Sequence, residues 1–192
     1  NLTENDYQGT VVDTSKGIII IKSEDHDEKD SHELGDPHIW LNPVYAKKQV
    51  ENIALAFSNA DPENREFFMT NAAKYSKELQ QLDSKIRNEL SDCNSDFIAF
   101  HDAFSYFAQE YDLNQHTIVA TNDFHGEVTA KTLENVISKA RELNMKIIFS
   151  EESVNTKTSQ IIANEIGGKV LVLSPLEIVS EDNYVSKMTQ NL

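Results

Sequence analysis

The chain has 192 residues, of which 17 are basic and 32 are acidic, so its formal net charge is −15. Such a surface repels phosphate backbones and anionic membranes, which argues against a nucleic-acid partner; it suits a cationic ligand, or a protein that only needs to be soluble. No apolar run approaches the ~20 residues of a membrane span, and the single cysteine, Cys93, excludes an internal disulfide and a CxxC motif.

The N-terminal part reads as a short β region followed by a charged loop. The stretch GTVVDTSKGIIIIKS, broken at Gly17, predicts two strands or a strand pair within residues 1–23. Residues 24–35 are densely charged, contain His26 and His32, and are expected to be a mobile loop. The polar start shows no signal peptide, so we expect either a cytosolic protein or a chain that begins after a processed or trimmed N-terminus.

Two helices are predicted next. The first follows Pro43 and ends near NADPE. The second begins at Asp61-Pro62, an expected cap followed by a proline in the first turn. Its apolar residues recur at steps of three and four, which predicts a long spine between two lobes or, alternatively, a coiled-coil helix. They are Phe68, Ala72, Tyr75, Leu79, Leu82, Ile86 and Leu90.

From Asp96 onward, short apolar runs alternate with amphipathic segments. Strands are expected at 96–100, 116–121, 145–150 and 169–174, and helices at 103–111, 133–143, 158–166 and 184–192. The third of these helices should end at Gly167-Gly168. This alternation predicts an α/β fold with a parallel sheet covered by helices on both faces.

Ligands of such sheets bind beyond the carboxyl ends of the strands. Imidazoles and carboxylates gather at this edge, which is the ligand set for zinc, or for manganese where oxygens dominate. His101 is the strongest candidate because strand and helix backbone hold it on both sides, although a locally bonded histidine would look the same. The candidates at the strand ends are His101-Asp102, Asn122-Asp123 with His125, Glu151-Glu152, and Ser174 with Glu177.

The other candidates carry weaker signals. His38 lies in GDPHIWLNP, a stiff setting that suits a ligand but also a histidine that is simply packed beside Trp40. Glu151 and Glu152 are interpreted as helix-terminal carboxylates, and His116 as structural. No GxSxG, HExxH, phosphate-binding glycine loop or convincing Ser/His/Asp set supports catalysis.

Two motifs in this order resemble one family. DPHIWLNP at 36–43 and FHDAFSYFAQEYDL at 100–113, joined by the long helix, resemble the metal-binding solute-binding proteins of ABC importers. This is the zinc and manganese uptake type that includes bacterial adhesin-lipoproteins. The segment IIFSEESVNTKTSQIIANEIGGKVLVLSPLE resembles the C-terminal lobe of that family.

The resemblance implies a ligand set. It implies that His38 and His101 bind metal, and because manganese-type members often have glutamate at the second position, His101 favours Zn²⁺ over Mn²⁺. The family's last ligand is a carboxylate after the final strand. Ser174 stands where some relatives have aspartate, so Glu177 is the expected third ligand, as in relatives with PLE endings.

The resemblance also implies an organisation and a setting. Residues 1–60 would be the end of an N-terminal lobe, 61–92 the spine helix and 93–192 the C-terminal α/β lobe, and the family's further histidine in a PHxxEP-like segment is absent. We expect an extracytoplasmic monomer, with any lipid anchor outside this chain, that delivers metal to an ABC permease and is not an enzyme. Two alternatives remain: a metal-dependent enzyme using His101 and Glu177, and an adhesin or interaction protein with a structural metal.

Overall fold

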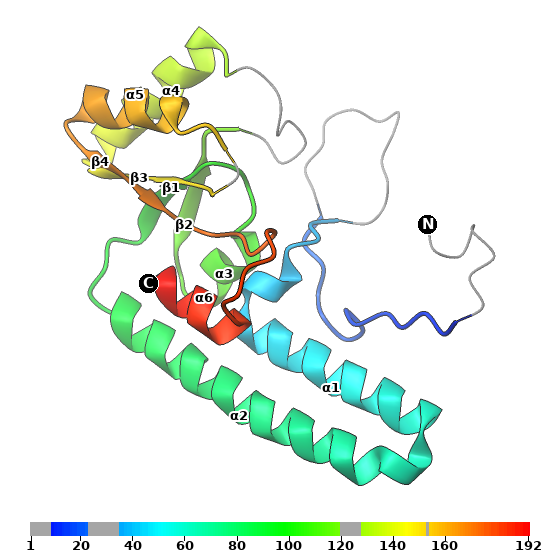
Figure 1. Ribbon diagram of the computed structural model, residues 1–192. Coiled ribbons are helices and arrows are strands. Elements are labelled where there is room, and N and C mark those ends of the chain that lie inside the picture. The colour runs from blue at the N-terminus through cyan, green and yellow to red at the C-terminus, as the bar shows by residue number, and fades with distance from the viewer. Residues whose placement is uncertain (1–8, 23–34, 120–127, 153) are drawn as a thin grey trace.

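A computed structural model describes residues 9–22, 35–119, 128–152 and 154–192 of the chain. A layer of short strands lies between helices, and a long two-helix hairpin extends beneath it (Figure 1). Within these ranges, no helix is both long and apolar enough to cross a bilayer.

Residues 9–22 contain a turn at 14–17 and otherwise have no helix or strand, so the strand pair predicted there is wrong. The backbone of Ile21 shows why. Its N–H donates to the hydroxyl of Tyr106 (3.0 Å), and its carbonyl accepts from the N–H of Asp36 (2.8 Å). These bonds take the place of a strand ladder. Ile19 is 82% exposed, so the apolar run does not mark a buried strand.

The helix expected after Pro43 is α1 (Pro43–Ala60). The side-chain oxygen of Asn42 accepts hydrogen bonds from two backbone N–H groups of its first turn. Proline fits this turn because the N–H that it lacks would have no helical partner. A short 3-10 helix, η2 (Ile39–Leu41), comes immediately before α1. Stiff local structure therefore follows His38 directly.

The long helix predicted from Asp61 onward is observed as a 3-10 turn, η3 (Pro62–Asn64), followed by α2 (Arg65–Leu90). Asp61 caps the turn as predicted, by accepting from the backbone N–H of Asn64. α2 packs along α1 and against α6 (Tyr184–Gln190), so its apolar stripe is covered within the chain (Figure 1). Every residue of the predicted stripe is at least partly buried.

Four short parallel strands follow in the predicted order. They are β1 (Asp96–Ala99), β2 (Asn114–Thr117), β3 (Ile147–Ser150) and β4 (Lys169–Val172). In the part of the chain that the structure describes, β1 pairs with β2 and β3 with β4, and β1 also lies against β3. The predicted parallel arrangement is confirmed, although β2 begins and ends earlier than expected.

Helices cover both faces of this layer, as predicted (Figure 1). α4 (Ala130–Glu142) and α5 (Lys157–Ile166) pack on one face, over a core that includes Ile98, Ile148 and Ile162. α5 ends at Gly167, whose φ of 62° is the left-handed cap conformation expected there.

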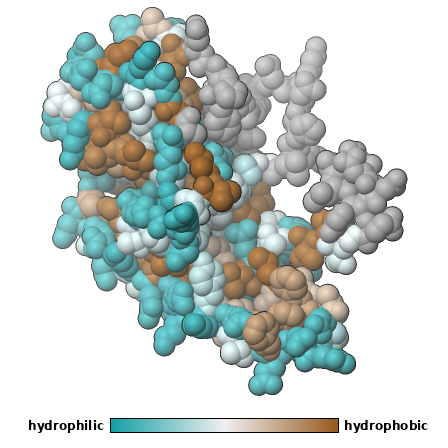
Figure 2. All heavy atoms as spheres, in the orientation of Figure 1, coloured by the Kyte–Doolittle hydropathy of each residue, from teal (hydrophilic) through white to brown (hydrophobic). Residues whose placement is uncertain are grey.

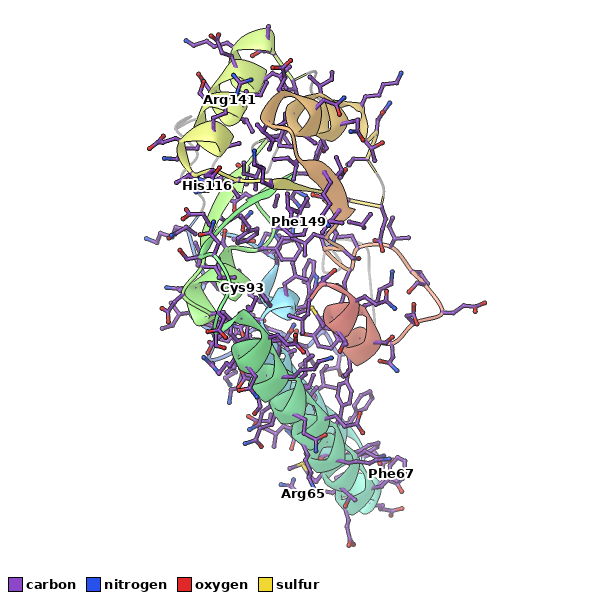
Figure 3. All side chains as sticks on the ribbon, turned by 90° about the vertical axis from the view of Figure 1, so that its left-hand side faces the viewer. Arg65, Phe67, Cys93, His116, Arg141 and Phe149 are labelled. Atoms are coloured by element: carbon purple, nitrogen blue, oxygen red, sulfur yellow. The ribbon has the colours of Figure 1, made fainter. Side chains whose placement is uncertain are left out.

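The opposite face of the layer packs against α2, α3 (Ser105–Glu110) and α6. Its core includes Ile86, Leu173 and Met188. Phe149 extends from β3 into the space between the strands and α6 (Figure 3). The strands are expected to be buried on both faces. Val172, on β4, is an exception because it is 56% exposed.

Hydrophobic side chains also reach the surface over α1, among hydrophilic neighbours (Figure 2). Ile53, Leu55 and Phe57 are exposed there. Phe57 stacks on Phe68 of α2 with ring centroids 5.3 Å apart. Phe67 marks this far end of the hairpin, remote from the strands (Figure 3).

Candidate metal centre

His38 is held by the residues that precede it. One carboxylate oxygen of Asp36, Oδ1, accepts hydrogen bonds from both the backbone N–H of His38 (2.9 Å) and its ring Nδ1 (2.7 Å). Gly35, whose φ is 62°, leads the chain into this turn and lies close to the backbone of Ile21. The imidazole is almost fully buried. Its orientation therefore follows from the local sequence GDPH.

His101 has the same kind of support from a distant segment. It follows β1 and is completely buried. Oε1 of Glu151, just after β3, accepts from the backbone N–H of His101 (3.1 Å) and bonds to its Nδ1 at 2.5 Å. The side-chain amide of Gln115 donates to the His101 carbonyl (3.1 Å). The adjacent strands β1 and β3 thus bring together two groups that are 50 positions apart.

Both histidines bond a buried carboxylate through Nδ1, and Nε2 of each lies near the same oxygen of Glu177. A carboxylate on Nδ1–H fixes the tautomer and ring orientation and raises the basicity of Nε2. The two rings lie with centroids 5.4 Å apart and an interplanar angle of 60°. Such a pair is oriented as a pair of nitrogen ligands.

Glu177 supplies the third group. It lies in the segment between β4 and α6, and its Oε1 is 3.3 Å from Nε2 of His38 and 3.9 Å from Nε2 of His101. At bond lengths of about 2.0–2.2 Å, two ligand atoms of a tetrahedral zinc site lie about 3.4 Å apart. Ligand atoms of all three residues fall within 4.8 Å of one another. The spacing is therefore close to that of a metal site.

The electrostatics of the cluster favour positive charge. Burial lowers the pKa of His38, but the hydrogen bond and charge of Asp36 and the charge of Glu177 raise it more, so the net shift of the pKa is upward. The carboxylates thus stabilise a proton on this imidazole. The same field would stabilise a cation.

The three residues predicted as ligands are brought together, whereas other candidates are not. His116 bonds Asp96 (2.8 Å) on the paired strands β1 and β2 and takes no part in the cluster. Asp102 accepts from the hydroxyl of Ser105 (2.7 Å), and Ser174 donates to Glu152 (2.7 Å). His26, His32, Asn122, Asp123 and His125 lie outside the described residues.

Two carboxylates support the site in roles that the sequence does not predict for them. The sequence places Glu151 at the edge with His101 and favours a helix-terminal role for it, but its backbone comes before α5 by several residues and its side chain bonds His101. Asp36 was part of the DPH motif without a separate role. The signal available in the sequence is the spacing of two residues between Asp36 and His38. No short motif connects Glu151 with His101, which lies 50 positions away.

Two buried imidazoles and a carboxylate, converging from three segments, define a protein that is able to hold a divalent cation. Over residues 1–192 the sequence matches the family described as ZnuA, zinc-uptake complex component A, periplasmic. It is 37% identical over 196 residues to the high-affinity zinc uptake system protein ZnuA of Bacillus subtilis (strain 168), covering 94% of this chain and 61% of that protein. The chain belongs to the ZnuA family.

Solved structures have the same fold. A crystal structure of ZnuA matches with a TM-score of 0.80 and 33% identity, covering 94% of this chain and 66% of that one. The laminin-binding protein Lmb of Streptococcus agalactiae, described as bifunctional with adhesin and metal transporting activity, matches with a TM-score of 0.80 and 29% identity, over 93% and 66%. The predicted fold class is confirmed. The chain spans less than two thirds of the length of these proteins.

Proposed function

We propose that this chain captures Zn²⁺ between His38, His101 and Glu177, and that the protein delivers the ion unchanged to an ABC permease. The observation that carries this proposal is the convergence of two Nε2 atoms and one carboxylate oxygen at near-ligand spacing. The names of the relatives support the same cargo, since the Bacillus subtilis protein is a zinc uptake protein.

Zinc is proposed over manganese on the chemistry of the ligands. Two imidazole nitrogens and one carboxylate suit zinc, whereas manganese prefers sites dominated by oxygen. Asp36 and Glu151 add negative charge behind the imidazoles without offering a ligand atom to the cluster. Mn²⁺ is the less favoured alternative.

Capture requires that the Nε2 atoms of His38 and His101 carry no proton. Asp36 and Glu151 fix the tautomer of each neutral ring by accepting the proton that it keeps on Nδ1. A proton on Nε2 competes with the cation, so binding releases protons. A tetrahedral site needs a fourth ligand beyond these three side chains, and water or a further protein group would supply it.

A carrier is proposed rather than an enzyme because the nearby acids are engaged. Glu151 is bonded to His101, and Asp102 bonds the hydroxyl of Ser105 at the start of α3. A metal-dependent hydrolase would need such an acid beside a metal-bound water. The buried carboxylates are instead arranged to orient ligands.

The proposed setting is extracytoplasmic, in keeping with the periplasmic description of the family. The protein would act as a monomer, with the permease as its partner and any lipid anchor outside this chain. We retain the division into a lobe remainder (1–60), a spine (61–92) and a C-terminal lobe (93–192) as part of the proposal. His38 would then come from the first part, and His101 with Glu177 from the last.

Titration with Zn²⁺ against a competing chelator tests the site. We expect His38→Ala, His101→Ala and Glu177→Ala each to weaken binding by more than about 100-fold, beyond the loss typical of residues that only support a ligand. His116→Ala is the matched control, because it removes an imidazole bonded to Asp96 away from the cluster. Unchanged affinity in the three cluster variants would contradict the proposal.

A second candidate function is an adhesin or interaction protein in which the metal is structural. The likeness to Lmb, whose description combines adhesin and metal transporting activity, favours it. The two candidates differ in what metal removal does to the fold.

A further inference from the structure

Trp40 joins the segment of His38 to the segment of Glu177. Its indole N–H donates to the carbonyl oxygen of Pro175 (2.9 Å), a residue 135 positions away. Its own backbone carbonyl accepts from the hydroxyl of Tyr184 (2.7 Å), at the start of α6. One residue therefore connects the chain on both sides of Glu177 to the turn that carries His38.

The Trp40 ring also touches the proposed ligand directly. It meets the His38 ring edge to face, with centroids 5.3 Å apart. The position of the indole is thus coupled to the orientation of one ligand through packing. Its N–H couples it to the backbone two residues before another ligand, Glu177.

The start of the Glu177 segment is anchored by a second set of bonds. Ser174 is buried; its hydroxyl donates to Glu152 (2.7 Å) and accepts from the N–H of Leu176 (3.3 Å). The side chain of Asn191 bonds both the N–H and the carbonyl of Ser174 at 2.8 Å. Leu176 has a φ of 59°, a left-handed conformation that turns the chain immediately before Glu177.

Beyond this turn the segment is poorly anchored. The Glu177 side chain is 34% exposed, and Ile178 and Val179 are exposed. The anchors of Ser174 hold the segment to α6 and the end of β3, whereas the Trp40 bond to Pro175 connects it to the His38 turn. The hydrogen bond from the indole N–H to Pro175 therefore helps to set the distance between Glu177 and His38.

We propose that Trp40 is a positioning residue that holds the Glu177 segment at ligand distance from His38, so that the carboxylate is in place before the metal arrives. This inference rests on the proposed function. Holding a ligand in its bound position in advance reduces the entropy lost on binding and increases affinity. Residues that orient ligands in this way typically contribute 10–100-fold to metal affinity.

The test variant is Trp40→Phe, which keeps an aromatic ring against His38 and removes the donor to Pro175. Titration of the 192-residue chain with Zn²⁺ should show affinity reduced by about tenfold. With Co²⁺ in place of Zn²⁺, the visible absorption bands should change because they report coordination geometry. Tyr111→Phe is the matched control: it removes an aromatic hydroxyl bonded to Asp83 (3.0 Å), and should change neither result.

A double-mutant cycle with Glu177→Ala identifies the route of the effect. If Trp40 acts through Glu177, Trp40→Phe should cause no further loss once the carboxylate is gone. A tenfold loss that persists in the Glu177→Ala background would overturn the inference, as would wild-type affinity in Trp40→Phe itself. Tyr184→Phe, which removes the bond to the Trp40 carbonyl, should weaken binding in the same direction and provides the cycle if Trp40→Phe does not fold.

Different results would overturn the proposed metal site and the positioning role of Trp40. Wild-type affinity in Glu177→Ala would overturn the proposed site, and this inference with it. A loss in Glu177→Ala together with wild-type binding in Trp40→Phe would overturn the coupling alone.

Discussion

Nδ1 of His101 lies 2.5 Å from Oε1 of Glu151, and both side chains are almost completely buried. The same oxygen accepts from the backbone N–H of His101. Asp36 makes the equivalent pair of bonds to His38 from a position two residues away. The chain thus builds the same local arrangement twice, once within a turn and once across the strand layer.

Glu151→Gln should weaken Zn²⁺ binding by about tenfold, because a neutral amide accepts the Nδ1 hydrogen bond of His101 less strongly than a carboxylate and orients the ring less well. The amide keeps nearly the same shape, so the fold should remain. Chelator competition measures the affinity, and circular dichroism verifies the fold. Glu165→Gln is the control, since it removes one charge from an exposed pair with Arg141. Equal affinity in both variants would show that Glu151 does not support the site.

Gly35→Ala should destabilise the chain more than Gly167→Ala. Both glycines have a φ of 62°, so the cost of the left-handed backbone, about 1–2 kcal/mol, is common to both. A Cβ at Gly35 would lie 2.6 Å from the carbonyl oxygen of Ile21, whereas a Cβ at Gly167 meets no atom within 4 Å. The difference between the two variants therefore isolates the clash.

Urea unfolding measures this difference in stability between the two variants, and Zn²⁺ titration measures a difference in their metal affinity. Gly35 directly precedes Asp36, which bonds His38, so Gly35→Ala should also weaken metal binding. Gly167 ends α5, away from the cluster, and its variant should bind as the parent chain does. Equal stability of the two variants would contradict the close approach at Gly35.

The elements that could be predicted from the sequence are those that local chemistry decides. The α2 stripe, the cap at Asp61 and the left-handed Gly167 follow from periodicity and backbone preference, and all are observed. The strand pair predicted within residues 1–23 is not observed in residues 9–22, the described part of that range, because Ile21 bonds Tyr106 and Asp36. Non-local partners determined that outcome.

The residues of the candidate site likewise include some that local sequence motifs predict and others that depend on distant contacts. His38 and His101 lie in motifs that can be recognised within short stretches, and Glu177 follows a strand end. The role of Glu151 is not predicted, because its bond to His101 exists only after β1 and β3 come together. The Trp40 bond to Pro175 likewise spans 135 positions and leaves no local pattern.

Glu152 should make stability depend on pH in the acid range. The hydrogen bond from Lys187 (2.7 Å), with further contributions from Ser174 and the lysine charge, holds the pKa of Glu152 below its ordinary value despite some burial. A carboxyl group with a lowered pKa stabilises the fold above its unfolded pKa, 4.5 for Glu152, and this contribution is lost as pH falls through the folded pKa.

The comparison with Glu152→Gln isolates this contribution, since the other acids titrate in both proteins. The parent chain should be more stable at pH 7 by less than about 1 kcal/mol, as for other partly exposed ion pairs. The difference should shrink as pH falls below about 4.5. Urea unfolding at several pH values measures it, and a difference that grew on acidification would contradict the assignment.

Removing metal should empty the site without unfolding the chain. His38 and His101 are held by Asp36 and Glu151, and the cores on both faces of the strand layer consist of buried apolar side chains. Chelator treatment should therefore leave the far-ultraviolet circular dichroism unchanged.

Adding Zn²⁺ back at 100 times its Kd should increase the free energy of unfolding by about 2.7 kcal/mol, because the ion binds the folded state. His116→Ala should show the same increase, and Glu177→Ala a smaller one at the same Zn²⁺ concentration. Loss of the folded signal on chelation would favour a structural metal and the adhesin-type alternative over a carrier that loads and releases its cargo.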